Sequence, residues 1–230
     1  MKISAIIVAA GKGERFGGNI PKAFFPLNRK PLLAYVLEAF NQVSDIVEII
    51  VTLRSSLMGE FWEKQMGKFS LVKPIKLVQG GETRSDSVWN ALQKVDRESE
   101  IVLIHDAARP FVTLQLISDV IEGALKWGAS IPGLRVKPTI KEVNPKGFIV
   151  KTHDREKLFE AQTPQGFRVD LLKEAFKKAS STRSIATDEA FLIESQGGRV
   201  KVVEGDEKNI KITTPADLEW AEWIMHRSSS

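Results

Sequence analysis

The chain has 230 residues, of which 43% are hydrophobic and 27% charged, a composition typical of a globular protein. It contains no cysteine, which excludes disulfides, thiolate nucleophiles and cysteine metal sites. The net charge of +4 arises from 33 basic and 29 acidic residues, a mixed surface that argues against nucleic acid and suits small anionic substrates. No apolar run reaches the roughly 18 residues of a membrane span, so we expect a cytoplasmic protein with neither membrane nor nucleic-acid partners.

Apolar runs alternate with amphipathic segments along the first half of the chain. Runs rich in Ile and Val predict buried strands at 3–9, 47–53, 75–78 and 101–105. Amphipathic segments predict helices at 31–43, 55–66, 84–95 and 114–127. Thr113 is placed to cap the last of these and Gly128 to stop it. This alternation predicts a mostly parallel sheet, in which ligands bind where the strands end.

The pattern changes after residue 138. Residues 139–143 and 148–152 alternate in polarity around an Asn-Pro-Lys-Gly turn and predict a β-hairpin, too polar on one face for a sheet core. It therefore predicts an arm that projects from the body, although an ordinary edge hairpin has the same signature. The pattern then predicts helices at 169–180 and 188–195 and short strands at 199–203 and 209–212. A final helix starts with Thr214 as N-cap and Pro215 in its first turn.

A glycine-rich loop at 9–22 follows the first predicted strand. Glycines allow backbone N–H groups to approach phosphate oxygens, and Arg15 and Lys22 add positive charge. A dinucleotide fingerprint would require glycine where Phe16 stands, and the Gly-Lys-Ser/Thr ending of a Walker loop is absent. A bare Gly-x-Gly is compatible with a simple turn, but the two cations favour a loop that binds phosphate.

Six blocks of sequence carry a family resemblance. They are Ala-Ala-Gly-x-Gly-x-Arg with Pro-Lys (9–22), Gly-Gly-Glu-Thr-Arg-Ser-Asp-Ser-Val (80–88), His-Asp-Ala-Ala-Arg-Pro (105–110), Thr-Pro-Gln (163–165), Thr-Asp-Glu (187–189) and Asn-Ile-Lys (209–211). In this order they resemble nucleotidyltransferases that activate sugars and polyols, and in particular the 2-C-methyl-D-erythritol 4-phosphate cytidylyltransferase family. The resemblance implies an α/β, Rossmann-like three-layer nucleotidyltransferase fold with a mostly parallel sheet. It also implies one domain, 1–230, with a β-arm at 136–156 that joins two copies into a homodimer.

The resemblance further implies an activity. CTP and 2-C-methyl-D-erythritol 4-phosphate would react to give the CDP-alcohol and pyrophosphate, with Mg²⁺ as cofactor, in the non-mevalonate pathway to isoprenoids. Ribitol 5-phosphate cytidylyltransferase shares the nucleotide loop and stays open as an alternative. A nucleotide-sensing or nucleic-acid-binding module without catalysis is the alternative from another class.

The family's site residues map onto this chain. The catalytic set is Arg15, Lys22, Arg155 and Lys211. The nucleotide-binding set is Ala9, Ala10, Gly11, Gly13, Gly81, Glu82 and Ser87. The set that binds the polyol phosphate is Asp106, Arg109, Thr139, Arg155, Thr163, Thr187 and Lys211, and Asp106 is also the candidate metal ligand with the phosphates of CTP.

The chemistry of this reaction fits the residue types. Two polyanions must meet, so the protein has mainly to supply positive charge and alignment. The attacking phosphate has a second pKa of about 6 and is largely dianionic at neutral pH, so it needs no general base. We accordingly expect His105 to be a packed, hydrogen-bonded residue at a strand end and not a catalyst. Residues 83–87 and 187–188 could also act simply as helix caps, and the hairpin residues Thr139 and Arg155 could serve a neighbouring subunit.

Overall fold

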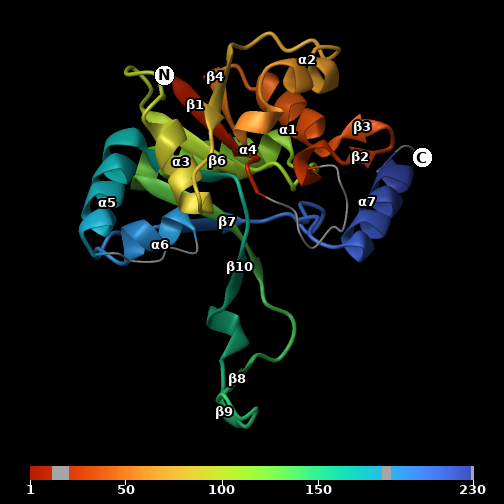
Figure 1. The fold of residues 1–230 in the computed structure, drawn as a ribbon. Coiled ribbons are helices and arrows are strands. Elements are labelled where there is room, and N and C mark those ends of the chain that lie inside the picture. The colour runs from red at the N-terminus through yellow and green to blue at the C-terminus, as the bar shows by residue number, and fades with distance from the viewer. Residues whose placement is uncertain (12–20, 183–187, 229–230) are drawn as a thin grey trace.

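The computed structural model describes residues 1–11, 21–182 and 188–228. Within these residues eight strands form one twisted sheet in the order β10-β7-β11-β6-β1-β4-β5, with β12 paired to β7. Helices cover both faces of the sheet, and a long hairpin projects from one end (Figure 1). The predicted three-layer α/β fold is confirmed.

The parallel half of the sheet contains the four strands predicted from the sequence. They are β1 (Ile3–Val8), β4 (Ile46–Leu53), β5 (Ile75–Gln79) and β6 (Ile101–Asp106). In the register of this sheet, Val8 lies opposite Thr52 on one side and Asp106 on the other. The loops that follow these strands therefore leave the sheet at the same edge.

The other half of the sheet was not predicted, apart from its edge strand. It consists of β7 (Ala129–Arg135), β10 (Phe159–Ala161), β11 (Gln165–Arg168) and β12 (Lys201–Glu204). β11 runs antiparallel between β6 and β7, and β12 runs parallel to β7. Pro132 and Gly133 interrupt the apolar pattern of β7, which hides it from a periodicity argument.

The predicted strand at 209–212 is wrong. This segment forms a loop against the body, where Ile212 donates its N–H to the carbonyl of Ala108 at 2.9 Å and is fully buried. Its apolar residues reflect burial under the last helix and not strand pairing.

The two faces of the sheet each pack against a different set of helices and form two apolar cores. Ile3, Ala5 and Ile7 of β1 point to the side covered by α1 (Leu32–Asn41), α2 (Glu60–Met66) and α4 (Leu114–Trp127). Ile6 points to the opposite side, covered by α3 (Arg84–Leu92), α5 (Val169–Thr182) and α6 (Glu189–Glu194). This alternation along one strand is the expected result of a side-chain period of two.

The predicted caps are present. Thr113 Oγ1 accepts the N–H of Leu116 at the start of α4, and Gly128, with a φ of 86°, ends it. The predicted helix 55–66 is divided into a 3₁₀ turn, η3 (Ser55–Leu57), and α2, because Gly59 adopts a φ of 70° between them.

A small third core joins the two ends of the chain. The last helix, α7 (Pro215–Ser228), packs over the hairpin β2 (Pro26–Leu27) and β3 (Lys30–Pro31), which follows η2 (Lys22–Phe24). Its buried members are Leu27, Leu32, Ile212 and Ala221. No helix in the described ranges is both long and apolar enough to cross a membrane.

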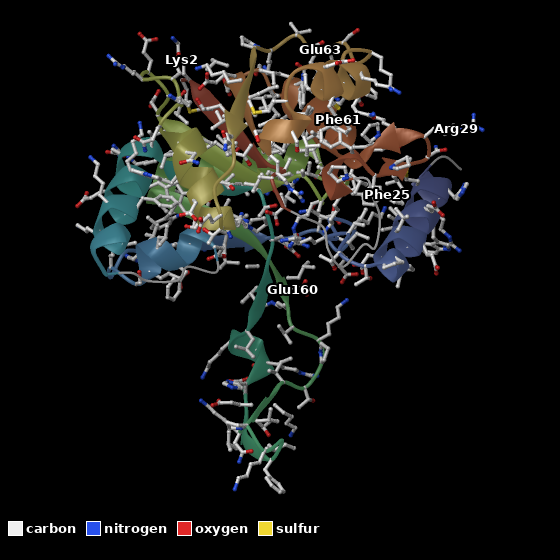
Figure 2. The ribbon with its side chains drawn as sticks, in the orientation of Figure 1. Lys2, Phe25, Arg29, Phe61, Glu63 and Glu160 are labelled. Atoms are coloured by element: carbon white, nitrogen blue, oxygen red, sulfur yellow. The ribbon has the colours of Figure 1, made fainter. Side chains whose placement is uncertain are left out.

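The arm contains β8 (Lys141–Val143), β9 (Ile149–Thr152) and η4 (Arg155–Lys157). Its two strands pair antiparallel, and every residue of both is exposed. The arm leaves the body near Glu160 and extends well away from it (Figures 1 and 2). The predicted projecting hairpin is thus confirmed.

Candidate active site

A pocket of about 640 Å³ opens where β1, β4, β5 and β6 end. Residues from six separated segments form its walls: Ala9, Ala10, Gly11, Lys22, Arg54, Gly81, Glu82, Arg84, Ser87, Asp106 and Lys211. All the predicted nucleotide-binding residues that lie within the described ranges are therefore brought together. Arg15, Gly13 and Thr187 lie outside those ranges.

The loop after β5 is held by bonds to β4 and to the start of α3. Gly80 donates its N–H to the carbonyl of Leu53 at 2.8 Å, and Gly81 donates its N–H to Ser87 Oγ at 3.0 Å. Thr83 caps α3 in a capping box with Asp86. A Cβ on Gly81 would lie 2.2 Å from the Cβ of Asp86, so only glycine fits this approach. The loop thus combines a helix cap with a wall of the pocket, and its contact with a nucleotide stays a prediction.

Asp106 stands at the centre of the site, at the last position of β6. Arg84 donates from Nε to Asp106 Oδ1 at 3.0 Å, and the Lys211 ammonium lies 2.6 Å from Oδ2. Burial alone would raise the pKa of Asp106, but the charges of Arg84 and Lys211 outweigh it and hold the pKa well below its usual value. Asp106 is therefore an anion whose two oxygens both face cations.

A second carboxylate completes this cluster. Glu189, the first residue of α6, accepts from Arg84 Nη1 at 2.7 Å on each of its two oxygens. The carboxylate pair outweighs the desolvation of Arg84 and raises its pKa, so the guanidinium stays charged. The sequence reasoning assigned no role to Arg84 or Glu189, although both lie inside blocks that carry the resemblance. Because Arg84 and Glu189 are 105 positions apart, no local sequence pattern indicates that they pair.

His105 is buried behind Asp106, as expected. Its Nε2–H donates to the carbonyl of Arg109 at 3.1 Å, and its Nδ1 accepts the hydroxyl of Thr163 at 3.0 Å. Burial lowers the pKa of His105 to about 4, so the ring is neutral at pH 7. Thr163 Oγ1 also accepts the N–H of Asp106 at 3.2 Å. Thr163 is buried and lines neither cavity described here, so its contact with a substrate stays a prediction.

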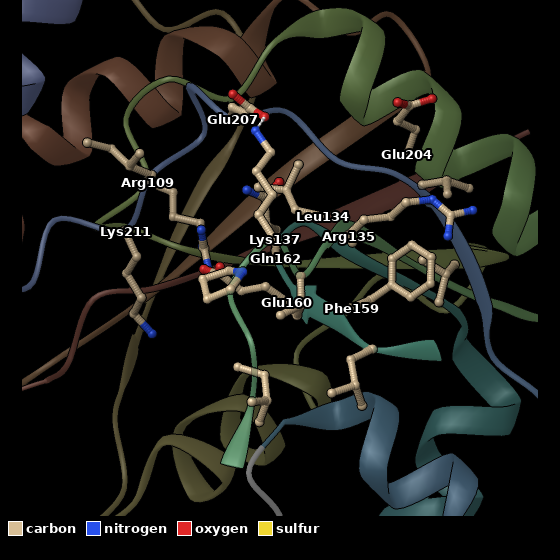
Figure 3. A pocket seen from close by; sticks show the side chains of 18 of the residues that line it. Arg109, Leu134, Arg135, Lys137, Phe159, Glu160, Gln162, Glu204, Glu207 and Lys211 are labelled. Carbon is tan, nitrogen blue, oxygen red and sulfur yellow. Dashed lines mark hydrogen bonds and ion pairs between the residues drawn. The ribbon is translucent and has the colours of Figure 1, made fainter. Parts of the chain in front are cut away.

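A larger cavity of about 1,580 Å³ adjoins the pocket, and Lys211 and Thr213 line both. Arg109 and Lys211 lie at one side of this cavity, with Lys137 and Glu160 from the base of the arm (Figure 3). Arg109 donates to the carbonyl of Asn209 at 2.8 Å, and burial lowers its pKa. Among the buried side-chain atoms described, Arg109 Nε and Asn209 Oδ1 lack a hydrogen-bond partner. Arg109 lines this cavity, whereas Asn209 is fully buried and does not line it.

The arm residues lie apart from this cluster. Arg155 opens η4 and donates to the carbonyl of Lys137 at 2.8 Å, and Thr139 is exposed on the opposite strand of the arm. Neither residue lines the pocket or the larger cavity of its own chain. The structure therefore brings Lys22 and Lys211 to one pocket, but not Arg155.

Comparison with known proteins agrees with this geometry. Residues 3–227 match the profile of the family described as 2-C-methyl-D-erythritol 4-phosphate cytidylyltransferase, also called IspD. The chain belongs to the IspD family. Relatives of that name are 42% identical in Caldanaerobacter subterraneus, over 99% of this chain and 100% of the relative, and 43% identical in Bacillus cereus, over 96% of each.

Solved IspD structures share the fold. The 4-diphosphocytidyl-2C-methyl-D-erythritol synthase of Anaerococcus prevotii is 31% identical, with a TM-score of 0.87 over 98% of this chain and 96% of that one. The IspD of Francisella tularensis is 36% identical, with a TM-score of 0.82 over 97% and 99%. The likeness thus covers the sheet and the arm together, and is not confined to the nucleotide loop.

Proposed function

We propose that this IspD-family chain transfers CMP from CTP to 2-C-methyl-D-erythritol 4-phosphate. The products are 4-diphosphocytidyl-2-C-methyl-D-erythritol and pyrophosphate, in the methylerythritol phosphate pathway to isoprenoids. The observation that carries the proposal is the position of Lys211, which lines both the strand-end pocket and the larger cavity. CTP in the pocket and the alcohol phosphate in the cavity would meet at this ammonium.

The main obstacle to this reaction is repulsion between two anions. A like-charge pair about 4 Å apart costs about 4 kcal/mol at an effective dielectric of 20. Lys22 and Lys211 line the pocket from opposite ends of the chain, and Arg15 belongs to the glycine loop that leads to Lys22. In our proposal these cations hold the triphosphate, and Lys211 together with Arg155 aligns the attacking phosphate. No general base is required, which agrees with a neutral, internally bonded His105.

The remaining walls of the pocket suit a nucleoside. The backbone of Ala9, Ala10, Gly11 and Gly13 would face the phosphates, because a loop without bulky side chains lets N–H groups approach them. Gly81, Glu82 and Ser87 would bind the cytosine and ribose. A base whose edge does not match such fixed polar groups leaves them unpaired, which gives strong discrimination.

The alcohol phosphate would occupy the larger cavity near Lys211. Asp106 and Arg109 would contact its polyol, together with Thr163 and Thr187. The Arg109 guanidinium, whose residue lines this cavity, would offer hydrogen-bond donors to the polyol hydroxyls.

The metal proposed for this site is Mg²⁺. No group of three or more acidic or histidine side chains suited to a metal occurs among the described residues. One buried carboxylate, Asp106, does face the pocket, and this fits an ion that takes its other ligands from phosphates and water. When bound, Mg²⁺ would neutralise phosphate charge beside Lys22.

The whole chain, 1–230, would act as one domain with residues 136–156 as the dimerisation element. The arm exposes Val143, Phe148, Ile149 and Val150, side chains that a second copy could cover. In such a homodimer Thr139 and Arg155 would serve the site of the neighbouring subunit, which accounts for their distance from their own. The cytoplasmic location also stays a prediction.

Pyrophosphate release with CTP and Mg²⁺ tests the proposal, with mass spectrometry of the product. We expect turnover with 2-C-methyl-D-erythritol 4-phosphate and little with ribitol 5-phosphate. Preference for ribitol 5-phosphate would replace the assigned acceptor. Absence of turnover with either, or tight binding to duplex DNA or RNA at physiological salt, would contradict the proposed function.

A further inference from the structure

Arg84 connects three elements of the site through one side chain. Its Nε bonds to Asp106 at the end of β6, and its Nη1 bonds to both oxygens of Glu189 at the start of α6. Arg84 is itself the first residue of α3, directly after the loop that carries Gly81 and Glu82. The side chain thus joins the nucleotide loop, the central carboxylate and the helix that follows Thr187.

Glu189 is buried in a way that excludes direct contact with substrate. Only 1% of its surface is exposed, and it lines neither the pocket nor the larger cavity. Its carboxylate faces Arg84, which lines the pocket and retains 27% of its side-chain surface. Any effect of Glu189 on the reaction must therefore act through Arg84.

The guanidinium geometry restricts Asp106. A planar fork held at one end by a carboxylate has little freedom to rotate, so its Nε presents a fixed donor to Asp106 Oδ1. The other oxygen, Oδ2, is left facing Lys211 at 2.6 Å. A lysine at position 84 would supply the same charge, but a single ammonium could not hold both carboxylates in these directions.

We propose that Arg84, anchored by Glu189, is a positioning residue that sets the orientation of Asp106 toward Lys211, the residue that lines both the pocket and the cavity. The inference rests on the proposed function and extends it to two residues without an assigned role. It also makes the Arg84–Glu189 pair a link between the nucleotide side of the site and the acceptor side. Its contribution is alignment of Asp106, so its loss lowers kcat more than substrate affinity.

A purely structural ion pair is the competing explanation. Replacing both members of a buried ion pair by apolar residues often leaves stability unchanged, whereas removing one member costs much of it. The double variant Arg84→Met/Glu189→Met therefore separates the two roles. Because Asp106 keeps Lys211 as a partner, we expect the double variant to melt closer to the unsubstituted protein than Arg84→Met does. Its kcat should stay about 10²-fold lower, the usual scale for a catalytic group displaced by 1 Å.

Two single variants sharpen the test. Glu189→Gln keeps the shape of the side chain but loosens the guanidinium, and we expect kcat to fall about 10-fold with the Kd for CTP unchanged. In Arg84→Ala, added guanidinium should restore part of kcat, and methylammonium at the same concentration should not. Rescue by guanidinium alone would show that the reaction needs the planar guanidinium group of Arg84, because a misfolded protein would not be rescued.

Glu48→Gln is the matched control. Glu48 is another buried carboxylate with a basic partner, Lys76, at 2.5 Å, but it lies on β4 away from both cavities. It should lose stability and keep kcat. An active parent chain with near-normal kcat in the double variant would overturn the inference and leave the proposed function intact. A fall confined to CTP affinity in Glu189→Gln would overturn it as well, whereas an inactive parent chain would count against the function itself.

Discussion

The strand-end pocket and the arm belong to one chain but are stabilised in opposite ways. Around Asp106, side chains from distant parts of the sequence pair at 2.6–3.0 Å, and the two carboxylates are almost fully removed from water. On the arm the bonds are local, such as Lys141 with Thr152, and apolar side chains face outward, with Phe148 67% exposed. The pocket is defined by its internal contacts, whereas the arm leaves apolar side chains exposed on its outer surface.

This contrast predicts where substitutions act. A change in the pocket disturbs charges that water cannot replace, so its effect on chemistry or folding should be large. A change at the tip of the arm removes little from the folded chain and should show mainly in assembly. Four experiments test this contrast.

Lys22→Ala should give the largest effect. The ammonium lines the pocket on the segment that follows the glycine loop, and loss of one charged transition-state contact costs about 10³-fold in kcat. Steady-state pyrophosphate release measures it. Lys64→Ala, on the exposed side of α2, is the matched control and should be silent. A Lys22→Ala enzyme with near-normal kcat would remove the electrostatic basis of the mechanism.

The buried imidazole of His105 should make folding sensitive to acid. Its pKa falls from 6.5 in the unfolded chain to about 4 in the folded one, so the unfolded state binds one more proton between these values. Stability is complete above pH 6.5 and falls as the pH drops, by about 1.4 kcal/mol per unit and about 3 kcal/mol in all.

Denaturant titrations from pH 4 to pH 7, without divalent ions, measure this slope. His105→Gln cannot take up the proton, so its stability should depend less steeply on pH, by about one proton. Parallel curves for the two proteins would show that another group is responsible.

Gly81→Ala tests the tight loop after β5. The added Cβ would meet the Cβ of Asp86 at 2.2 Å, and overpacking of this kind costs about 1–3 kcal/mol. The loop also walls the pocket, so the KM for CTP should rise while that for the alcohol phosphate changes little. Gly147→Ala is the control: its φ of 83° makes the substitution strain the backbone, but no atom lies within 4 Å of the added Cβ. It therefore measures backbone strain without a steric clash. Equal effects on both KM values would argue against a nucleotide-facing loop.

Phe148→Ser should have the smallest effect on the fold. The ring is exposed at the tip of the arm, so the free energy of unfolding of the isolated chain should change by less than about 0.5 kcal/mol. The oligomeric state, measured by sedimentation, should shift toward monomer. A large loss of stability without dissociation would mean that the arm packs on its own body.

The sequence predicted the elements whose signals are local. The four parallel strands have continuous apolar runs, the caps at Thr83, Thr113 and Thr214 stand at fixed positions, and the arm has a turn between alternating strands. The centre of the candidate site could be predicted only as separate blocks. The ion pair of Arg84 with Glu189 joins residues 105 positions apart and depends on the packing of α3 beside α6.

The strands β7, β10 and β11 were missed for a related reason. Pro or Gly interrupts β7 and β11, and β10 has only three residues, so each becomes a strand only because neighbours already offer hydrogen bonds. The segment 209–212 was predicted as a strand but forms a loop, because its apolar residues are buried under α7 and so resemble the apolar pattern of a strand.

The small core beneath α7 packs the C-terminal helix against the segments that carry two of the pocket's lysines. Ile212 follows Lys211 directly and packs with Leu27, five residues after Lys22, and with Ala221 of the last helix. Asp217 fixes the turn between them, because its Oδ2 accepts the N–H groups of Thr213 and Thr214. Lys22 and Lys211, nearly 190 residues apart in sequence, therefore both lie on segments that pack into this one apolar core. We expect that removal of the final 16 residues, which form α7 and the end of the chain, would displace both lysines without deleting either.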